Sequence, residues 1–121
     1  MRQRILIVED NPQNRLLVKA VLEFHGYEIM EAKDGQEGIE MAKKYKPDLI
    51  LMDLQMPVMD GFIAGKIIRG DPDTKNIKMI ALTSFAMSGD KERIMKAGFD
   101  HYIAKPIDTR ELPDLIKEIL K

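Results

Sequence analysis

Five polar side chains follow short apolar runs of this sequence, each at the point where a run ends: Glu9, Asp10, Asp53, Thr83 and Lys105. The clearest run is Leu49–Met52, which reads as a strand buried on both faces and stops at Asp53. A carboxylate next to such a run is usually paired, bound to a metal or solvated at the strand's end. An aspartate in this position can act as a nucleophile that accepts a phosphoryl group and forms an acyl phosphate.

The chain around these residues alternates between strand-like and helix-like patterns. Apolar or alternating runs predict five strands, at Ile5–Val8, Tyr27–Ala32, Leu49–Asp53, Met79–Thr83 and His101–Ala104. Periodic apolar residues predict a helix after each strand, with helix starts at Asn11, Asp34 and Asp60 and helix ends at Gly26 and Gly98. Strands that alternate with helices in this way form a parallel sheet covered by helices on both faces.

The polarity of the strands predicts their order in the sheet. The first, third and fourth strands are apolar throughout and belong inside, whereas the second and fifth are mixed and belong at the edges. The order 2-1-3-4-5 meets this requirement. We therefore expect an α/β fold of flavodoxin type, a doubly wound (βα)5 sandwich of three layers, formed by residues 1–121 as one domain.

The helical patterns also predict which side chains reach the core. Spacings of three and four select Leu16, Leu17, Ala20, Val21 and Phe24 in the first helix, Ile39, Ala42 and Tyr45 in the second, and Ile63, Ala64, Ile67 and Ile68 in the third. Pro113 disturbs the start of the last helix, because Asp108 and Glu111 imitate a capping box that would leave the proline just past the first turn. Either that helix begins later or its first turn is irregular.

The predicted order brings the five polar residues to one edge. In a parallel sheet all carboxyl ends of the strands lie at the same edge, where ligands of such sheets bind, and neighbouring strands are about 4.8 Å apart. Glu9 and Asp10 then lie beside Asp53, and three carboxylates so close raise one another's pKa values unless a cation lies among them. Mg²⁺ suits such a site because it prefers oxygen ligands. Thr83 is one strand away, and Lys105 is two strands away but has a long side chain.

This set of residues suits phosphoryl transfer, although each member has an ordinary reading. Mg²⁺ and Lys105 would offset charge on the phosphoryl oxygens, and Thr83 would donate a hydrogen bond to one of them. Taken singly, Asp53 is a turn or cap residue, Glu9 and Asp10 form a solvated strand end, Thr83 belongs to a strand and Lys105 faces solvent. The combination favours the chemical interpretation, because four of the five strand ends carry the types that one reaction needs.

The composition limits the classes of function. Of the 121 residues 45% are hydrophobic and 32% charged, and the formal net charge of −1 gives no basic excess for nucleic acid or a membrane surface. The chain has no cysteine, which excludes disulfides and thiolate chemistry and fits a reducing cytosol. The apolar run Ile5–Val8 is far too short for a signal peptide or a membrane span. We expect a soluble cytoplasmic protein.

Four segments of the sequence resemble a known family: Val8–Asn11, Asp53–Gly61, Thr83–Ser84 and Lys105–Pro106. In this order and at these intervals they resemble the receiver domains of two-component response regulators, over the whole chain. The resemblance implies that Asp53 is the phosphoacceptor, and that Mg²⁺ is held by Glu9, Asp10, Asp53 and the backbone carbonyl of Gln55. It also implies Lys105 as the partner of the phosphoryl group, Thr83 with Tyr102 as a switch pair, and a cis peptide bond before Pro106.

The same resemblance implies partners. The stretch Ala81–Lys96 is similar to single-domain cell-division regulators and to the receivers of hybrid kinases, and Gln55 and Phe85 are expected to tune the acyl-phosphate lifetime. A sensor histidine kinase or a histidine phosphotransfer protein would supply the phosphoryl group. The first helix begins beside the site with Pro12–Arg15, which are the candidate docking residues for this donor, and a solvated helix face explains them equally well. A downstream protein would read the face of the fourth helix, fifth strand and fifth helix. We expect a signalling protein that assists its own phosphorylation rather than an enzyme, with no effector domain after the last helix.

Three other functions stay open from the residues. A phosphatase of the haloacid dehalogenase type also uses an aspartyl nucleophile, but it needs an acid two residues later, where this chain has Gln55. A flavin or nucleotide carrier would need a glycine-rich loop after the first strand, where this chain has Glu9–Pro12. A receiver-like interaction module without phosphorylation is the third alternative.

Overall fold

Strands and helices alternate along the chain in the computed structural model, which describes residues 2–84 and 88–121. The strands are β1 Arg4–Val8, β2 Glu28–Ala32, β3 Leu49–Asp53, β4 Lys78–Thr83 and β5 His101–Ala104. The helices are α1 Pro12–Phe24, α2 Gly35–Tyr45, α3 Gly61–Gly70, α4 Ser88–Lys96 and α5 Glu111–Ile119. The expectation for Phe85 lies outside the described residues.

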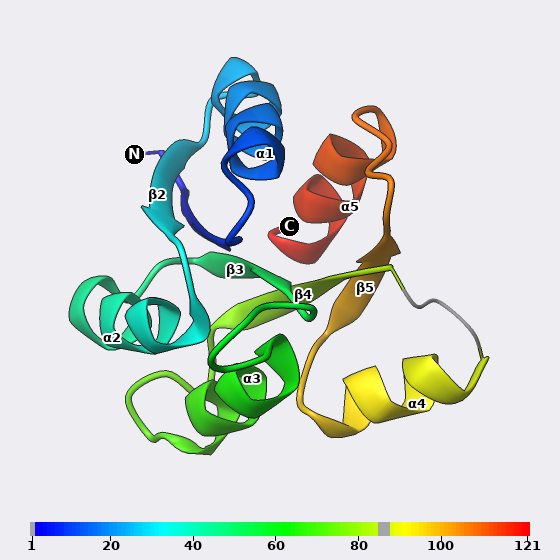
Figure 1. The fold of residues 1–121 in the computed structure, drawn as a ribbon. Coiled ribbons are helices and arrows are strands. Elements are labelled where there is room, and N and C mark those ends of the chain that lie inside the picture. The colour runs from blue at the N-terminus through cyan, green and yellow to red at the C-terminus, as the bar shows by residue number, and fades with distance from the viewer. Residues whose placement is uncertain (1, 85–87) are drawn as a thin grey trace.

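The strands form one parallel sheet in the order β2-β1-β3-β4-β5 (Figure 1), which confirms the predicted flavodoxin-like topology. The strands β1, β3 and β4, which carry the continuous apolar runs, are the inner ones, and every residue of β3 is buried. In the register, Val8 lies opposite Met52, Asp53 opposite Leu82, and Thr83 opposite Ala104. Neighbouring strands among β1, β3, β4 and β5 therefore end within one register position of each other.

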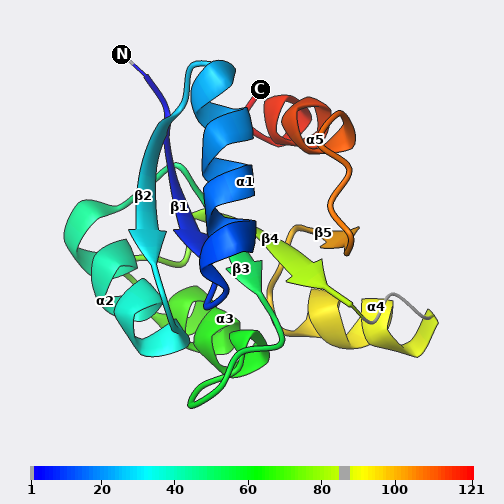
Figure 2. The same ribbon diagram turned by 45° about the horizontal axis from the view of Figure 1, so that its top comes forward.

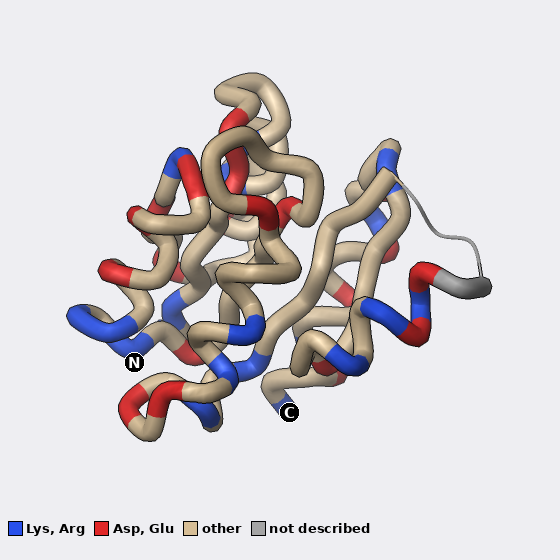
Figure 3. The backbone as a smooth tube through the Cα atoms, turned by 60° about the horizontal axis from the view of Figure 1, so that its bottom comes forward, with Lys and Arg blue, Asp and Glu red and all other residues tan. Residues whose placement is uncertain are grey.

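Helices cover both faces of the sheet, as Figures 1 and 2 show. α1 and α5 lie on one face, where Val18 and Leu22 of α1 and Leu112 and Ile116 of α5 pack against one set of alternate strand residues. α2, α3 and α4 lie on the other face and pack against the remaining set. None of the described helices combines the length and the apolar character needed to cross a bilayer. Figure 3 shows basic and acidic residues interspersed along the tube in that view, in keeping with the net charge of −1.

The predicted caps are confirmed. The Asn11 side chain accepts hydrogen bonds from the backbone N–H groups of Gln13 and Asn14 and starts α1, with Pro12 at its first position. The Asp34 carboxylate accepts a hydrogen bond from the backbone N–H of Glu37 and starts α2. In the same way the Asp60 carboxylate accepts from the backbone N–H of Ile63 and starts α3. Gly26 and Gly98 have φ angles of 91° and 100°, the left-handed conformation that ends a helix.

The predicted inward faces of three helices are partly wrong. In α1 the side chains of Leu16, Leu17 and Phe24 are 65%, 43% and 86% exposed, and Val18 and Leu22 are buried instead. The helix carries apolar residues on two faces, so the spacing alone could not decide which face packs. The same holds elsewhere for Ile63 and Ile67 in α3 and Tyr45 in α2, which are exposed while their predicted neighbours Ala64, Ile68 and Ala42 are buried. The buried residues of α3 include three small ones, Gly61, Ala64 and Gly65, which allow neighbouring elements to approach closely.

The start of α5 resolves the question that Pro113 raised. The helix begins at Glu111, so Pro113 occupies its first turn, where a missing N–H leaves no intrahelical hydrogen bond unmade. Asp108 Oδ1 accepts from the N–H groups of Arg110 and Glu111 at 2.8 and 3.3 Å and closes the turn before the helix. The helix therefore begins later than the capping-box pattern suggested.

Candidate functional site

Three carboxylates meet at the carboxyl edge of the sheet. Glu9 and Asp10 follow β1 and Asp53 ends β3, and each offers an oxygen that lies within 4.8 Å of the other two. The side chains of Glu9 and Asp53 are buried, whereas Asp10 is exposed. The strand order predicted that the three carboxylates would lie together, and the structure shows in addition that two of them are in the interior and one is at the solvent side.

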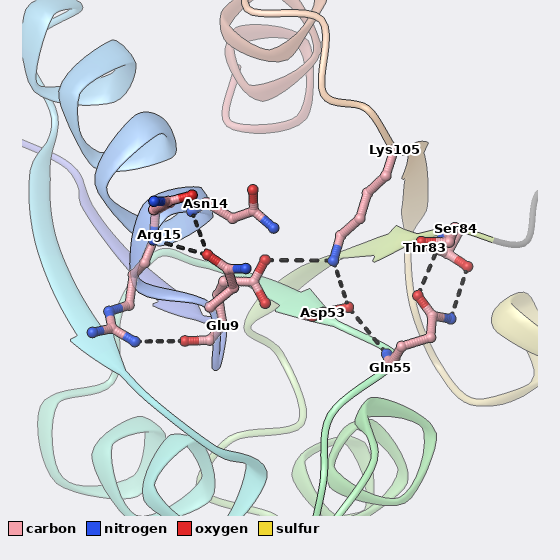
Figure 4. Close-up of polar contacts among 10 residues, drawn as sticks. Glu9, Asn14, Arg15, Asp53, Gln55, Thr83, Ser84 and Lys105 are labelled. Carbon is pink, nitrogen blue, oxygen red and sulfur yellow. Dashed lines mark hydrogen bonds and ion pairs between the residues drawn. The ribbon is translucent and has the colours of Figure 1, made fainter.

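Lys105 reaches this cluster from two strands away (Figure 4). Its Nζ lies 3.0 Å from Asp53 Oδ1 and 3.4 Å from Glu9 Oε1. The residue directly follows β5, and the Lys105–Pro106 peptide bond is cis, the isomer that the family resemblance implied. One ammonium group therefore contacts two buried carboxylates and cannot neutralise both.

The uncompensated charge falls on Glu9. The pKa of Glu9 is raised from 4.5 to about 8, mainly by burial and next by the neighbouring Asp53 carboxyl, while Lys105 and Asn14 lower it. Its Oε2 is buried and finds no hydrogen-bond partner among residues 2–84 and 88–121. A buried, unpaired carboxylate oxygen beside two further carboxylates suits a divalent cation with oxygen ligands.

The loop after β3 holds the Asp53 side chain in place. Asp53 Oδ1 accepts a hydrogen bond of 3.0 Å from the backbone N–H of Gln55 in addition to its contact with Lys105. The loop returns so closely that α3 begins against the end of β3. A Cβ on Gly61 would lie 2.4 Å from the Asp53 carbonyl oxygen, so only glycine fits there.

Thr83 is joined to the same loop through a side chain that sequence reasoning did not single out for this role. Gln55 Nε2 donates to Thr83 Oγ1 at 3.1 Å, and the backbone N–H of Ser84 donates to Gln55 Oε1 at 3.0 Å. Thr83 is buried at the end of β4. The sequence predicted a role for the backbone carbonyl of Gln55, but it has no local signal for the direction of this carboxamide.

The remaining predicted residue, Tyr102, lies on β5 and does not contact the carboxylates. It is half-buried, packs against the core beneath α4, and lies opposite Ala81 in the register, two residues before the pair of Thr83 and Ala104. Its place in a switch stays a prediction. Sequence reasoning also missed one anchor, since Arg15 Nη1 donates to the Glu9 carbonyl oxygen at 2.8 Å and fixes α1 to the site.

An open groove of about 410 Å³ borders the site on one side. It is lined by Asn14, Leu17, Ser84, Lys105, Pro106 and Ile107. A larger hollow, of about 880 Å³ and lined in part by Arg2, His25 and Lys117, contains none of the site residues. Of these two hollows, only the groove is lined by a residue that contacts the carboxylate cluster, Lys105.

Comparison with known proteins decides the family. The family model for the response regulator receiver domain matches residues 5–117. The chain belongs to this family. The polar-differentiation response regulator DivK of Brucella anthropi is 40% identical to this receiver domain over 120 residues, which cover 99% of this chain and 98% of DivK.

Solved structures of receiver domains agree with the fold. The receiver domain of the sensor histidine kinase PA1611 from Pseudomonas aeruginosa, which has a magnesium ion coordinated in its active-site cleft, is 37% identical with a TM-score of 0.91. That match covers 99% of this chain and 98% of the other. The receiver domain of Ssk1 from Saccharomyces cerevisiae, crystallised with the histidine phosphotransfer protein Ypd1, is 31% identical with a TM-score of 0.88 and covers 97% and 88% of the two chains.

Proposed function

We propose that Asp53 of this receiver domain accepts a phosphoryl group from a phosphohistidine donor and that the acyl phosphate switches its contacts with protein partners. The observation that carries this proposal is the placement of one buried aspartate between a lysine ammonium and an acidic pair at the sheet edge. A receiver domain works in two-component signalling, and this arrangement supports Asp53 as its phosphoacceptor.

The chemistry follows from how Asp53 is held. Lys105 and the Gln55 N–H both contact Oδ1, so we assign Oδ2 as the oxygen that attacks phosphorus. A new O–P bond forms as the P–N bond of the phosphoimidazole breaks, and the imidazole leaves and takes a proton from water. Lys105 offsets charge on the transferred group, and Thr83 donates a hydrogen bond to one of its oxygens. The protein supplies position and charge, which makes it a participant in its own phosphorylation.

A magnesium ion fits the acidic cluster. Glu9, Asp10 and Asp53 would hold it, and the family resemblance adds the carbonyl of Gln55. The unpaired Glu9 Oε2 supports this proposal, because a cation is the partner that a buried carboxylate oxygen needs. When bound, the ion would neutralise negative charge on the phosphoryl oxygens.

The groove beside Lys105 is our candidate for the donor's docking site. Leu17 and Ile107 line it, and the neighbouring Leu16 on α1 is 65% exposed, so an apolar surface adjoins the nucleophile. The complex of the Ssk1 receiver with Ypd1 supports a histidine phosphotransfer protein or a histidine kinase as donor. We place this exchange in the cytoplasm, in keeping with a chain without cysteine.

The signal would leave through the opposite side of the site. Thr83 ends β4 and Tyr102 lies two register positions away on β5, so a displacement of Thr83 towards a phosphoryl group would reach the α4, β5 and α5 surface. We propose that a downstream protein binds this surface in one of the two states.

The proposal is tested by incubating the protein with Mg²⁺ and acetyl phosphate and measuring its intact mass. We expect a gain of one phosphate in the wild type and none in Asp53→Asn, and an added chelator should abolish the gain. Absence of a gain in the wild type would favour an interaction module without phosphorylation. Steady turnover of a phosphomonoester would favour an aspartyl phosphatase instead. Against that function, the position of the phosphatase's acid is occupied by Gln55, whose side chain is hydrogen-bonded to Thr83.

A further inference from the structure

We propose that the Gln55 side chain is a latch that holds the end of β4 in its unphosphorylated position and must release it when Asp53 is phosphorylated. We call the hydrogen-bonded set of Gln55, Thr83 and Ser84 the Gln55 latch. Gln55 is here a positioning residue, and the inference rests on the proposed function of Asp53.

The latch connects the phosphoacceptor to the switch strand through one residue (Figure 4). The backbone N–H of Gln55 donates to Asp53 Oδ1, while its side chain extends to the end of β4. Both ends of the carboxamide are engaged there, Nε2 with the Thr83 hydroxyl and Oε1 with the Ser84 N–H. This two-point contact fixes the direction of the amide and joins the loop after β3 to the end of β4, since Thr83 and Ser84 lie 28 and 29 residues after Gln55.

A phosphoryl group on Asp53 would compete with Gln55 for the same strand end. It brings close to two negative charges and three strong acceptor oxygens to the site. The Ser84 N–H donates to Gln55 Oε1, and the Thr83 hydroxyl accepts from Gln55 Nε2. A phosphoryl group would therefore have to take the Ser84 donor from the carboxamide and draw the Thr83 side chain away from Nε2. Hydrogen bonds to a charged group are about twice as strong as neutral ones, so the phosphoryl group can displace the amide. Because these bonds to Gln55 must break first, the latch reduces the free energy gained on switching and thereby keeps the resting state populated.

The side chain of glutamine has the properties that the latch needs. Asparagine is one methylene shorter, and from the same backbone position it would not span the distance to both partners. Glutamate would lose the donor to Thr83 and would set a negative charge against the incoming phosphoryl group. Methionine has a similar length and volume but lacks both hydrogen-bonding groups, so Gln55→Met removes the latch and leaves the space filled.

The test compares wild type and Gln55→Met with beryllium fluoride and Mg²⁺ as the phosphoryl mimic. We expect Gln55→Met to bind the mimic about fivefold to tenfold more tightly, the effect of removing roughly one net hydrogen bond that opposes binding. Without the mimic, amide hydrogen exchange of Ser84, followed by NMR, should be faster by a similar factor in the variant. The matched control is Gln36→Met, an exposed glutamine on α2 that contacts only Glu40 among the described residues and should change neither value.

The outcomes separate the latch from other roles. A glutamine that merely supports the fold would give a variant with a lower melting temperature and weaker binding of the mimic, and that result overturns the latch. Equal affinity in the two proteins also overturns it. In Thr83→Val the effect of Gln55→Met should shrink to the part that Ser84 contributes. If Gln55→Met does not fold, Gln55→Asn should shift the affinity in the same direction.

Failure of the proposed function is recognised separately. In that case neither wild type nor Asp53→Asn takes up the mimic, and a regulatory latch on phosphorylation is overturned with it. If the wild type binds the mimic and Gln55→Met binds it no better, Asp53 remains the phosphoacceptor and only the latch is refuted.

Discussion

Glu9→Gln should stabilise the metal-free protein at alkaline pH. Glu9 is 1% exposed, its Oε2 has no hydrogen-bond partner among the described residues, and its one lysine contact is shared with Asp53. Glutamine has the same shape as the protonated glutamic acid and carries no charge. The variant therefore removes the electrostatic cost while leaving the packing at the end of β1 unchanged.

The magnitude follows from the pKa of Glu9. Its value is about 8 in the folded protein against 4.5 for an ordinary glutamate, so between these pH values the folded chain holds a proton that the unfolded chain has released. The stability that this proton contributes is complete below pH 4.5 and is lost as the pH rises to about 8. The full difference corresponds to roughly 5 kcal/mol, and because Asp53 shares Lys105 with Glu9, we expect about 2 to 4 kcal/mol.

The assay is urea unfolding of both proteins in chelator, at several pH values from 5 to 8.5. The free energy of unfolding of the wild type should fall relative to Glu9→Gln by about 2 to 4 kcal/mol across this range. Added Mg²⁺ should restore most of the loss in the wild type and less in the variant, because a bound ion stabilises only the folded state. Glu23→Gln, an exposed glutamate on α1, serves as control. Parallel pH profiles of wild type and Glu9→Gln would refute the reasoning.

Three further predictions concern neighbouring residues. Gly61→Ala should lower the free energy of unfolding by about 3 kcal/mol in a urea titration, because its Cβ would lie 2.4 Å from the Asp53 carbonyl oxygen at the end of β3. An unchanged urea midpoint would contradict this prediction. Val58→Asn should raise that free energy by about 1 kcal/mol, because Val58 has a φ of 70° with a side chain 97% exposed, and a loss of stability would argue against strain there. Lys105→Met should slow phosphorylation by acetyl phosphate at least tenfold, measured by intact mass, because Asp53 loses a charged partner. The control Lys66→Met, at an exposed position on α3, should not change the rate. Equal rates in wild type and Lys105→Met would remove Lys105 from the reaction.

The sequence by itself determined which strands lie inside the sheet and which at its edges, and the set of polar residues at their ends. Uniformly apolar runs at β1, β3 and β4 can be buried on both faces only inside the sheet, and the parallel arrangement then sends Glu9, Asp53 and Thr83 to one edge. The helix caps Asn11 and Asp60 could also be predicted from the sequence, because a cap bonds to backbone N–H groups only two or three residues away. These features are local, or follow from continuous apolar runs along a strand.

Only the tertiary structure decided the contacts between distant residues. The face of α1 that packs depends on where the helix docks on the sheet. Because the helix has apolar residues on two faces, its sequence does not decide whether Val18 or Leu17 is buried. The rise in the pKa of Glu9 needs burial that no single segment provides. The direction of the Gln55 carboxamide depends on the end of β4, 28 residues later. Contacts of this kind arise when separate elements meet in space, and a one-dimensional pattern does not encode the distance or the angle at which they do.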